Sequence, residues 1–254
     1  MASFIKKLFH NRCGSLRNTP LPANINLEQR FIFVHIPKTA GTSIYHALGM
    51  NISHHKPLSH YKNLLDRDVF AQLTKFAFVR DPLERFISLY KYARLKVSYF
   101  HNNVNPDKAL YGAHRDYELL KDASPLDCAR YLVEGKLLHN APDTIWLPQK
   151  RWLETDCGMS DINIIGRFEN LPNDFANICN QAGIIDKLQS PLGTFNQSNQ
   201  TAVKITDEVI DIVKNYYRED YDSFGYESSL AIQHQLSIES GNSGNSQSRC
   251  FSKA

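Results

Sequence analysis

The sequence predicts an α/β domain of three layers, in which a mostly parallel central sheet is flanked by helices. Two segments carry this prediction, residues 31–48 and residues 76–93, because each joins a short apolar run, a polar turn and a helix-like pattern. A third apolar run, residues 162–165, precedes another helical pattern over residues 171–182. Short strands that alternate with helices in this way are typical of a parallel sheet with helices on its faces.

The first unit begins with an apolar run, Phe31–His35, whose aromatic and β-branched residues suit a buried strand. Pro37 ends strand pairing because it has no backbone donor, and Ile44–Leu48 has the pattern of a first helical turn. The turn between them is polar and contains the residues expected to bind a ligand: Lys38, Thr39, Gly41, Thr42 and Ser43.

This turn has the composition of an anion site. Backbone N–H groups at the start of a helix point at a bound anion, the helix dipole favours it, and Lys38 adds a full charge. The turn differs from the nucleotide P-loop GxxxxGK[ST], because Lys38 precedes Gly41 and no glycine opens the loop. The alternative is an ordinary strand-to-helix turn with a solvated lysine.

The second unit begins with the strand-like run Phe76–Val79 and continues as a helix. Asp81 can cap this helix, Pro82 suits its first position, and Glu84 stands three residues after the cap. Arg80 lies at the end of the strand. One side of the helix is predicted to face the core through Phe86, Leu89, Tyr90 and Ala93.

Arg80, Arg85 and Ser88 make this second unit a further anion site. Arg85 and Ser88 lie one turn apart on the helix, a guanidinium can grip a phosphate with two hydrogen bonds, and a hydroxyl can donate to the same oxygens. The alternative is that the two arginines pair with Asp81 and Glu84 at the surface, where such pairs contribute little. Two successive units of this kind favour a ligand with two anionic groups.

The motifs HIPKTAGTS and VRDPLERFISLY together resemble those of the family 2, carbohydrate-type sulfotransferases. Further segments are similar to the same family: WLPQ, GRFENL, FNQS and YDSFGY, so the resemblance extends from about Phe31 to Tyr226. It implies a P-loop-like fold, similar to that of nucleotide kinases, and 3′-phosphoadenosine 5′-phosphosulfate (PAPS) as co-substrate, without a metal.

The resemblance also implies a role for individual residues. The 5′-phosphosulfate would be held by Lys38, Thr39, Gly41, Thr42 and Ser43, and the 3′-phosphate by Arg80 and Ser88. Asn196 and Ser198 of the FNQS segment resemble positions near the phosphate end of the co-substrate, and Gln149 is expected to hold the acceptor or to shape the floor of the pocket. Turn formation is the alternative role for each of these later residues.

Sulfuryl transfer by an in-line path needs charge stabilisation at the leaving phosphate and a base for the acceptor hydroxyl. Lys38 is the expected partner of the leaving phosphate. His55 is the expected base, because the resemblance places a histidine in a setting similar to residues 55–61; His54 and His60 are the alternatives, and all three could be exposed loop residues. The polar loop over residues 96–125 is expected near the acceptor.

Two other functions remain open from the sequence. A small-molecule kinase of P-loop-like fold would transfer phosphate with Mg²⁺, although the position of Lys38 and the lack of an obvious aspartate pair disfavour it. A non-catalytic module would bind PAPS, or its product adenosine 3′,5′-bisphosphate (PAP), and would need no base.

The 254-residue composition is that of an ordinary globular protein, with 22% charged residues and a net charge of only +3, which disfavours a nucleic-acid partner. No run reaches the length of a membrane span, so a cytoplasmic location is expected, with peripheral membrane contact through residues 4–9 as a further option. Five widely spaced cysteines show no zinc-type spacing and are interpreted mostly as free thiols.

Three parts of the chain are predicted: an irregular lead-in over residues 1–30, the sulfotransferase domain over residues 31–236, and a disordered tail over residues 237–254. The expected acceptor is a hydroxyl of a glycan or glycolipid, and the sequence leaves the oligomeric state open. Helices are also expected over Pro125–Leu138 and Asp207–Tyr217.

Overall fold

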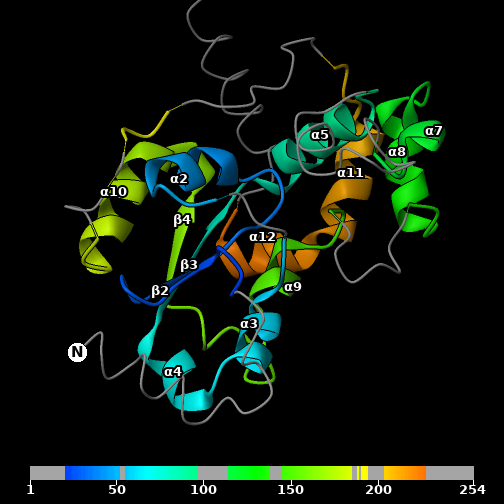
Figure 1. Cartoon of the computed structure of the whole chain (residues 1–254). Coiled ribbons are helices and arrows are strands. Elements are labelled where there is room, and N and C mark those ends of the chain that lie inside the picture. Colours follow the sequence, from blue (N-terminus) through cyan, green and yellow to red (C-terminus); the bar gives the residue numbers. More distant parts are fainter. Residues whose placement is uncertain are drawn as a thin grey trace, which may run out of the picture.

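A computed structural model describes residues 21–51, 55–96, 114–137, 145–184, 188, 190–193 and 203–226. Its single sheet has the order β1-β2-β3-β4, with β1 at Ile25–Asn26, β2 at Phe31–Val34, β3 at Thr74–Val79 and β4 at Ile164–Arg167 (Figure 1). β2, β3 and β4 run parallel, and β1 pairs with β2 in the antiparallel direction. The predicted α/β class with a mostly parallel sheet is therefore confirmed.

Side chains that alternate along β2 and β3 divide between the two faces of the sheet, as the period of two in a strand requires. On one face, Phe33 stacks on Phe76 with ring centroids 5.3 Å apart, and α2 (Gly41–Ala47) and α10 (Leu171–Gln181) cover these rings. On the other face, Val34 and Val79 pack under α3 (Leu58–Leu64), α4 (Arg67–Gln72) and α9 (Gln149–Leu153).

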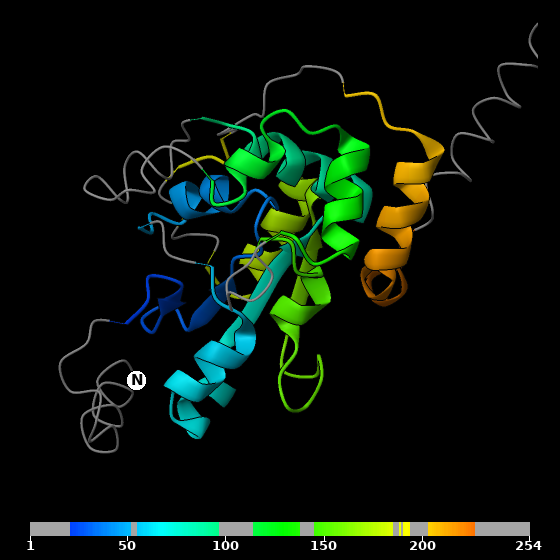
Figure 2. The ribbon, with the colours of Figure 1, turned by 90° about the vertical axis from the view of Figure 1, so that its right-hand side faces the viewer.

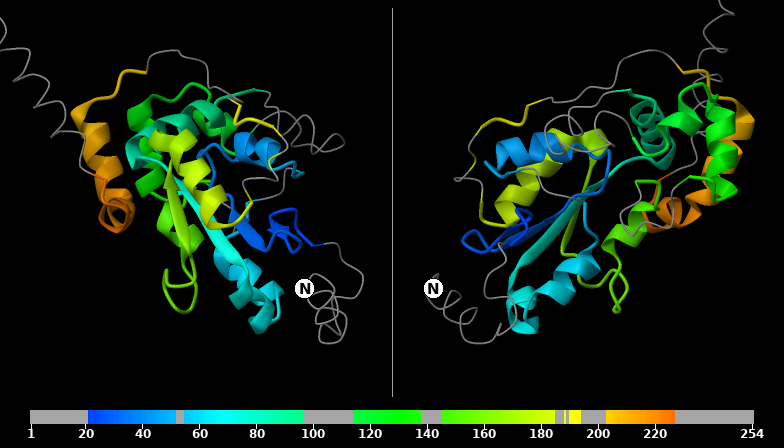
Figure 3. Two further views of the ribbon diagram at one scale, coloured as in Figure 1. Left: turned by 90° about the vertical axis from the view of Figure 1, so that its left-hand side faces the viewer. Right: turned by 45° about the vertical axis from the view of Figure 1, so that its right-hand side comes forward.

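Both faces of the central strands are thus buried, which explains why their sequences read as unbroken apolar runs. The two helical layers are visible on opposite sides of the sheet in Figure 3, with α2 and α10 together on one side and α3 and α4 on the other.

The remaining helices form a separate core beside the sheet. It is built from α5 (Pro82–Ala93), α7 (Tyr117–Leu120), α8 (Pro125–Val133), α11 (Asp207–Tyr216) and the start of α12 (Arg218–Phe224). α11 packs against α8 and α5, as Figure 2 shows, and the fully buried Trp146 lies within this core. α5 follows β3 directly, so this core fixes the direction of the chain as it leaves the sheet.

The helix starts agree with the expected caps. The Asp81 carboxylate accepts a hydrogen bond from the Glu84 N–H at 2.9 Å, and Pro82 occupies the first turn of α5. The helix that was expected over Pro125–Leu138 ends earlier, at Val133, because Gly135 turns the chain with a φ of 68°. β1 lies within the segment predicted as an irregular lead-in and extends the sheet into it.

Candidate functional site

The turn after β2 has an unusual backbone. Lys38 and Ala40 have φ angles of 70° and 67°, a left-handed conformation that costs free energy for any residue with a Cβ, while Thr39 between them does not. An alternation of left- and right-handed residues directs successive backbone N–H groups into one concave surface that suits an anion. The strain therefore coincides with the loop that the sequence assigned to ligand binding.

Thr39 and Gly41 fix the conformation of this loop through their contacts with Ile36 and His35. The Thr39 hydroxyl donates to the Ile36 carbonyl at 2.9 Å and is fully buried, so this side chain braces the loop and leaves the Thr39 backbone N–H as its group for a ligand. At Gly41 a Cβ would lie 1.8 Å from Nε2 of His35. Only glycine lets α2 begin directly over the His35 ring. Thr42 is half-buried and Ser43 is buried in the first turn of α2.

The Lys38 side chain is partly buried against α5, with Nζ 4.8 Å from the centroid of the Tyr92 ring. Burial, together with a smaller contribution from the nearby charge of Arg80, lowers the pKa of Lys38 to about 8. A lysine at this position is destabilised as a cation until an anion arrives beside it.

Arg80 stands directly after β3, with its guanidinium 4.2 Å from the centroid of the Phe168 ring. Its Nη2 lies 3.4 Å from the Glu84 carboxylate, so the ion pair considered in the sequence does form, although Glu84 is largely exposed. Burial lowers the pKa of Arg80, and its Nε is buried without a hydrogen-bond partner among the described residues. Ser88, 5% exposed, lies two turns along α5.

Arg85 has a structural role instead of the phosphate-binding role that the sequence predicts. It is 1% exposed, and its three nitrogens donate to the carbonyls of Pro37, Leu147 and Ile145 at 3.0, 3.0 and 2.9 Å. The expectation that Arg85 grips a phosphate is wrong, because the side chain is buried and each of its three nitrogens already donates to a backbone carbonyl. Instead Arg85 ties α5 to the ligand loop at Pro37.

His55 lies next to this loop and is half-buried, with its ring centroid 4.1 Å from that of His35 and its ring in a T-shaped arrangement with Trp152. Its Nδ1 is 3.0 Å from the His35 carbonyl oxygen. Because a carbonyl only accepts, Nδ1 carries the hydrogen and the neutral ring has its lone pair on Nε2. His35 itself is buried, and desolvation, followed by the charges of His55 and Lys38, holds its pKa well below the usual value.

Of the other predicted site residues, some are described by the structure and some are not. His60 is exposed on α3, whereas His54, Asn196, Ser198 and most of the predicted acceptor loop lie outside the described residues. Lys38, Arg80 and His55 are therefore brought to one end of the parallel strands, where ligands bind in such sheets.

Gln149 is fully buried, and its side-chain amide hydrogen-bonds the backbone of Arg80. Its side chain therefore supports Arg80 and does not face an acceptor. Asp220 and Glu169 join it there. The sequence alone gives no role to Asp220, and for Glu169 it allows either support of the site or an ion pair with Arg167. The signals in the sequence that could have indicated this support are the WLPQ, GRFENL and YDSFGY segments.

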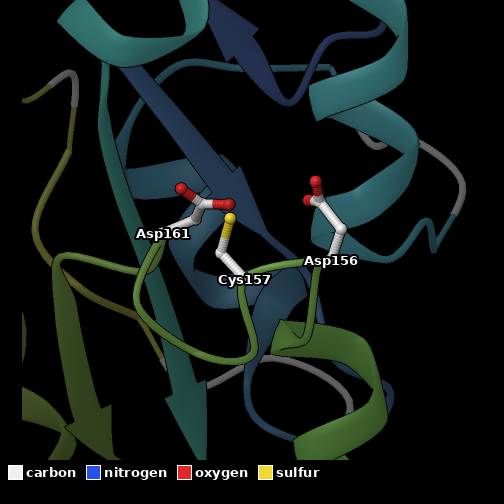
Figure 4. Close-up of side chains that lie close together, drawn as sticks. All are labelled: Asp156, Cys157 and Asp161. Atoms are coloured by element: carbon white, nitrogen blue, oxygen red, sulfur yellow. The ribbon is translucent and has the colours of Figure 1, made fainter.

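One group of side chains in the described part of the chain has the spacing of metal ligands: Asp156, Cys157 and Asp161 (Figure 4). The ammonium of Lys62 contacts all three, with hydrogen bonds to both carboxylates and a 3.5 Å contact to the Cys157 sulfur. A metal ion would have to displace this ammonium. The cluster therefore acts as an ion-paired link between α3 and the loop after α9.

Cys128, Cys157 and Cys179 are free thiols. Burial raises the pKa of Cys179 to about 11 and that of Cys128 further, so both behave as inert core residues, whereas Cys157 is exposed. Cys13 and Cys250 lie outside the described residues.

A strained loop with a lysine after one parallel strand, and an arginine after the next, define a protein of the α/β class that carries two cationic side chains at the ends of its parallel strands. A family model described as "Sulfotransferase family" matches residues 22–227, and the chain belongs to that family. The resemblance in the sequence is thereby confirmed. Neither the curated proteins nor the solved structures contain a significant match to the chain. No helix in the described ranges has both the length and the apolar character that crossing a bilayer requires.

Proposed function

We propose that the protein transfers a sulfuryl group from PAPS to a hydroxyl of an acceptor. The observation that carries this proposal is the meeting of Lys38 and Arg80, which come from successive strand–loop–helix units and are close enough for one charge to lower the pKa of the other. Two such cations, partly withdrawn from water, suit a ligand with separate anionic groups at its 5′ and 3′ positions.

The residues fit such a ligand on three counts. The loop has left-handed residues at Lys38 and Ala40, a backbone of the kind that forms anion-binding loops. Gly41 leaves no Cβ in the path of the chain, and Arg80 has a buried Nε without a partner among the described residues. Lys38 and the loop, with Thr42 and Ser43, would hold the 5′ side. Arg80 and Ser88 would hold the 3′-phosphate.

PAPS, when bound, supplies the sulfuryl group and a phosphate leaving group. The Lys38 ammonium would neutralise the charge that develops on that phosphate, and the loop N–H groups would add fixed dipoles that favour the same charge. Nε2 of His55 would take the proton of the acceptor hydroxyl, since the hydrogen bond from Nδ1 to the His35 carbonyl fixes the required tautomer.

We further propose a glycan or glycolipid as acceptor, on the strength of the resemblance to carbohydrate-type sulfotransferases. The cytoplasmic location and the absence of a metal from the reaction stay predictions from the sequence. So do the roles of Asn196 and Ser198.

Isothermal titration calorimetry with PAP, and separately with ATP plus Mg²⁺, tests the choice of ligand. We expect PAP to bind at least tenfold more tightly, because ATP has no 3′-phosphate for Arg80. Preference for ATP would favour the kinase alternative and overturn the proposal.

The base is tested by replacing His55 with Ala and following transfer from labelled PAPS to a panel of glycans. We expect transfer to fall by about 10²- to 10⁴-fold with nearly unchanged PAP affinity, as loss of a general base requires. His60→Ala, an exposed histidine only a few residues away, is the matched control and should keep full activity. A normal rate in His55→Ala would show that another group removes the proton.

A further inference from the structure

Arg80 joins β3 to α5 and lies beyond the end of the strand, yet its backbone N–H and C=O groups are both hydrogen-bonded. The Arg80 N–H donates to Oε1 of Gln149 at 2.8 Å, and Nε2 of Gln149 donates to the Arg80 carbonyl at 2.7 Å. A single side-chain amide thus replaces the pair of bonds that a neighbouring strand would supply. Because the amide is fully buried, it fixes the backbone of Arg80 without exchange with water.

Gln149 is itself held by Asp220, a fully buried carboxylate on α12. Asp220 accepts the backbone N–H groups of Gln149 and Lys150, both at 2.8 Å, and so caps the first turn of α9. Its Oδ2 also lies 3.4 Å from the Gln149 amide nitrogen, which orients that amide toward Arg80. Burial raises the pKa of Asp220, while Arg85 and the two N–H groups act against the rise.

A second side chain fixes the next residue along the chain. Oε1 of Glu169 accepts the Asp81 N–H at 2.7 Å, and Oε2 accepts the Tyr226 hydroxyl at 3.0 Å. Phe168, the residue before Glu169, supplies the ring against which the Arg80 guanidinium lies. The segments WLPQ, GRFENL and YDSFGY therefore converge on one peptide, although they are far apart in the sequence.

We propose that Gln149, Asp220 and Glu169 are positioning residues that hold Arg80 ready for the 3′-phosphate. The inference rests on the proposed function, because it needs Arg80 to contact that phosphate. None of the three contacts the ligand; they act through Arg80. An arginine whose backbone and side chain are already ordered loses less entropy when the anion binds, and this raises affinity.

The direction in which anion affinity changes when a carboxylate is removed distinguishes a positioning role from a general effect of charge. Asp220 and Glu169 are carboxylates close to an anion site, so their removal should strengthen anion binding if charge alone mattered. If these carboxylates position Arg80, their removal should instead weaken anion binding. Glu169→Leu is the suitable variant because Glu169 is exposed and its loss leaves no buried cavity.

We expect Glu169→Leu to weaken PAP binding about tenfold, which corresponds to about 1.4 kcal/mol, by calorimetry. Glu169→Gln keeps an oxygen acceptor for the Asp81 N–H and should stay within about twofold of the unaltered protein. Glu118→Leu removes another exposed carboxylate, on α7, and is the matched control. Tighter or unchanged PAP binding by Glu169→Leu overturns the proposal.

A double-mutant cycle shows whether the support acts through Arg80. Gln149→Met should weaken PAP binding about tenfold in the unaltered protein and less than about twofold in an Arg80→Ala background, since residues that act through one another are not additive. Equal losses in both backgrounds overturn the positioning role. If Arg80→Ala alone leaves PAP affinity unchanged, the 3′-phosphate assignment is wrong and the positioning role is wrong with it. If Arg80→Ala weakens PAP binding but Gln149→Met does not, only the positioning role is wrong.

Discussion

Lys38 gives the ligand site a titratable charge within the range of ordinary buffers. Its pKa of about 8 means that the free protein loses this charge as the pH rises above 8. A bound anion favours the ammonium and raises the pKa, so binding takes up a proton in that range. PAP affinity should therefore change little near pH 7, where Lys38 is charged and the phosphates of PAP are above their second pKa of about 6, and should fall by up to about tenfold per pH unit above 8.

Calorimetry at pH 7 and pH 9 measures this dependence. Lys38→Met is the control, since it should bind PAP more weakly at both pH values but without the fall above pH 8. A fall of equal size in Lys38→Met would assign the titration to another group.

Gly41 is the residue at which the loop and the His35 ring come closest. Gly41→Ala places a Cβ within 1.8 Å of His35 Nε2, so the start of α2 has to move. We expect a loss of about 1–3 kcal/mol in the free energy of unfolding and a parallel loss of PAP affinity. Thermal unfolding and calorimetry measure the two effects. Adding His35→Ala removes the obstructing ring, so the double variant should lose less than the sum of the single losses; strict additivity would contradict this explanation.

α5 depends on Arg85 for its attachment to the rest of the molecule. Replacing Arg85 with Met keeps most of the packed volume but leaves the carbonyls of Pro37, Leu147 and Ile145 without their donor. Each buried acceptor that loses a partner costs about 1–3 kcal/mol, so we expect a destabilisation of at least about 3 kcal/mol in urea unfolding.

Arg94→Met is the comparison for this variant. Arg94 ends the same helix and also donates to a backbone carbonyl, that of Lys121, but it is exposed. Water can replace its hydrogen bonds, so the loss should stay within about 1 kcal/mol. Similar losses for the two variants would show that burial of the acceptors is not what makes Arg85 important.

The start of α5 was predictable because its signals are local. Asp81, Pro82 and Glu84 act within one turn of chain, and the strand before them is a continuous apolar run. The role of Arg85 was not predictable, because its three partners lie 48 to 62 residues away and are backbone carbonyls that any sequence would offer. Sequence spacing placed Arg85 on the same helix as Ser88 but not in the same environment.

For the whole molecule, a ligand that binds only the folded state should raise the melting temperature. At about 100 times its dissociation constant, PAP adds about 2.7 kcal/mol, which for a domain of this size corresponds to about 5–10 °C. Thermal unfolding with and without PAP measures the shift. Arg80→Ala at the same PAP concentration should show a smaller shift, and no shift in the unaltered protein would contradict binding to the fold described.

The parallel strands and the two strand–loop–helix units could be predicted from the sequence, since each unit lies within about twenty residues and follows periodicity and composition. What could not be predicted is the side-chain support of Arg80. Gln149, Glu169 and Asp220 have no shared spacing, and each looks like an ordinary polar residue until the chain brings them to one peptide. The tautomer of His55 likewise depends on a carbonyl 20 residues away.

The order of synthesis gives this convergence a further consequence. Arg80 and Asp81 leave the ribosome early, while Asp220 and Tyr226, which complete their support, belong to the last described helix and the residues after it. Domains fold as units during translation, and a junction that depends on late residues has to wait for them. The peptide between β3 and α5 can therefore take its final hydrogen bonds only after Tyr226 has left the ribosome.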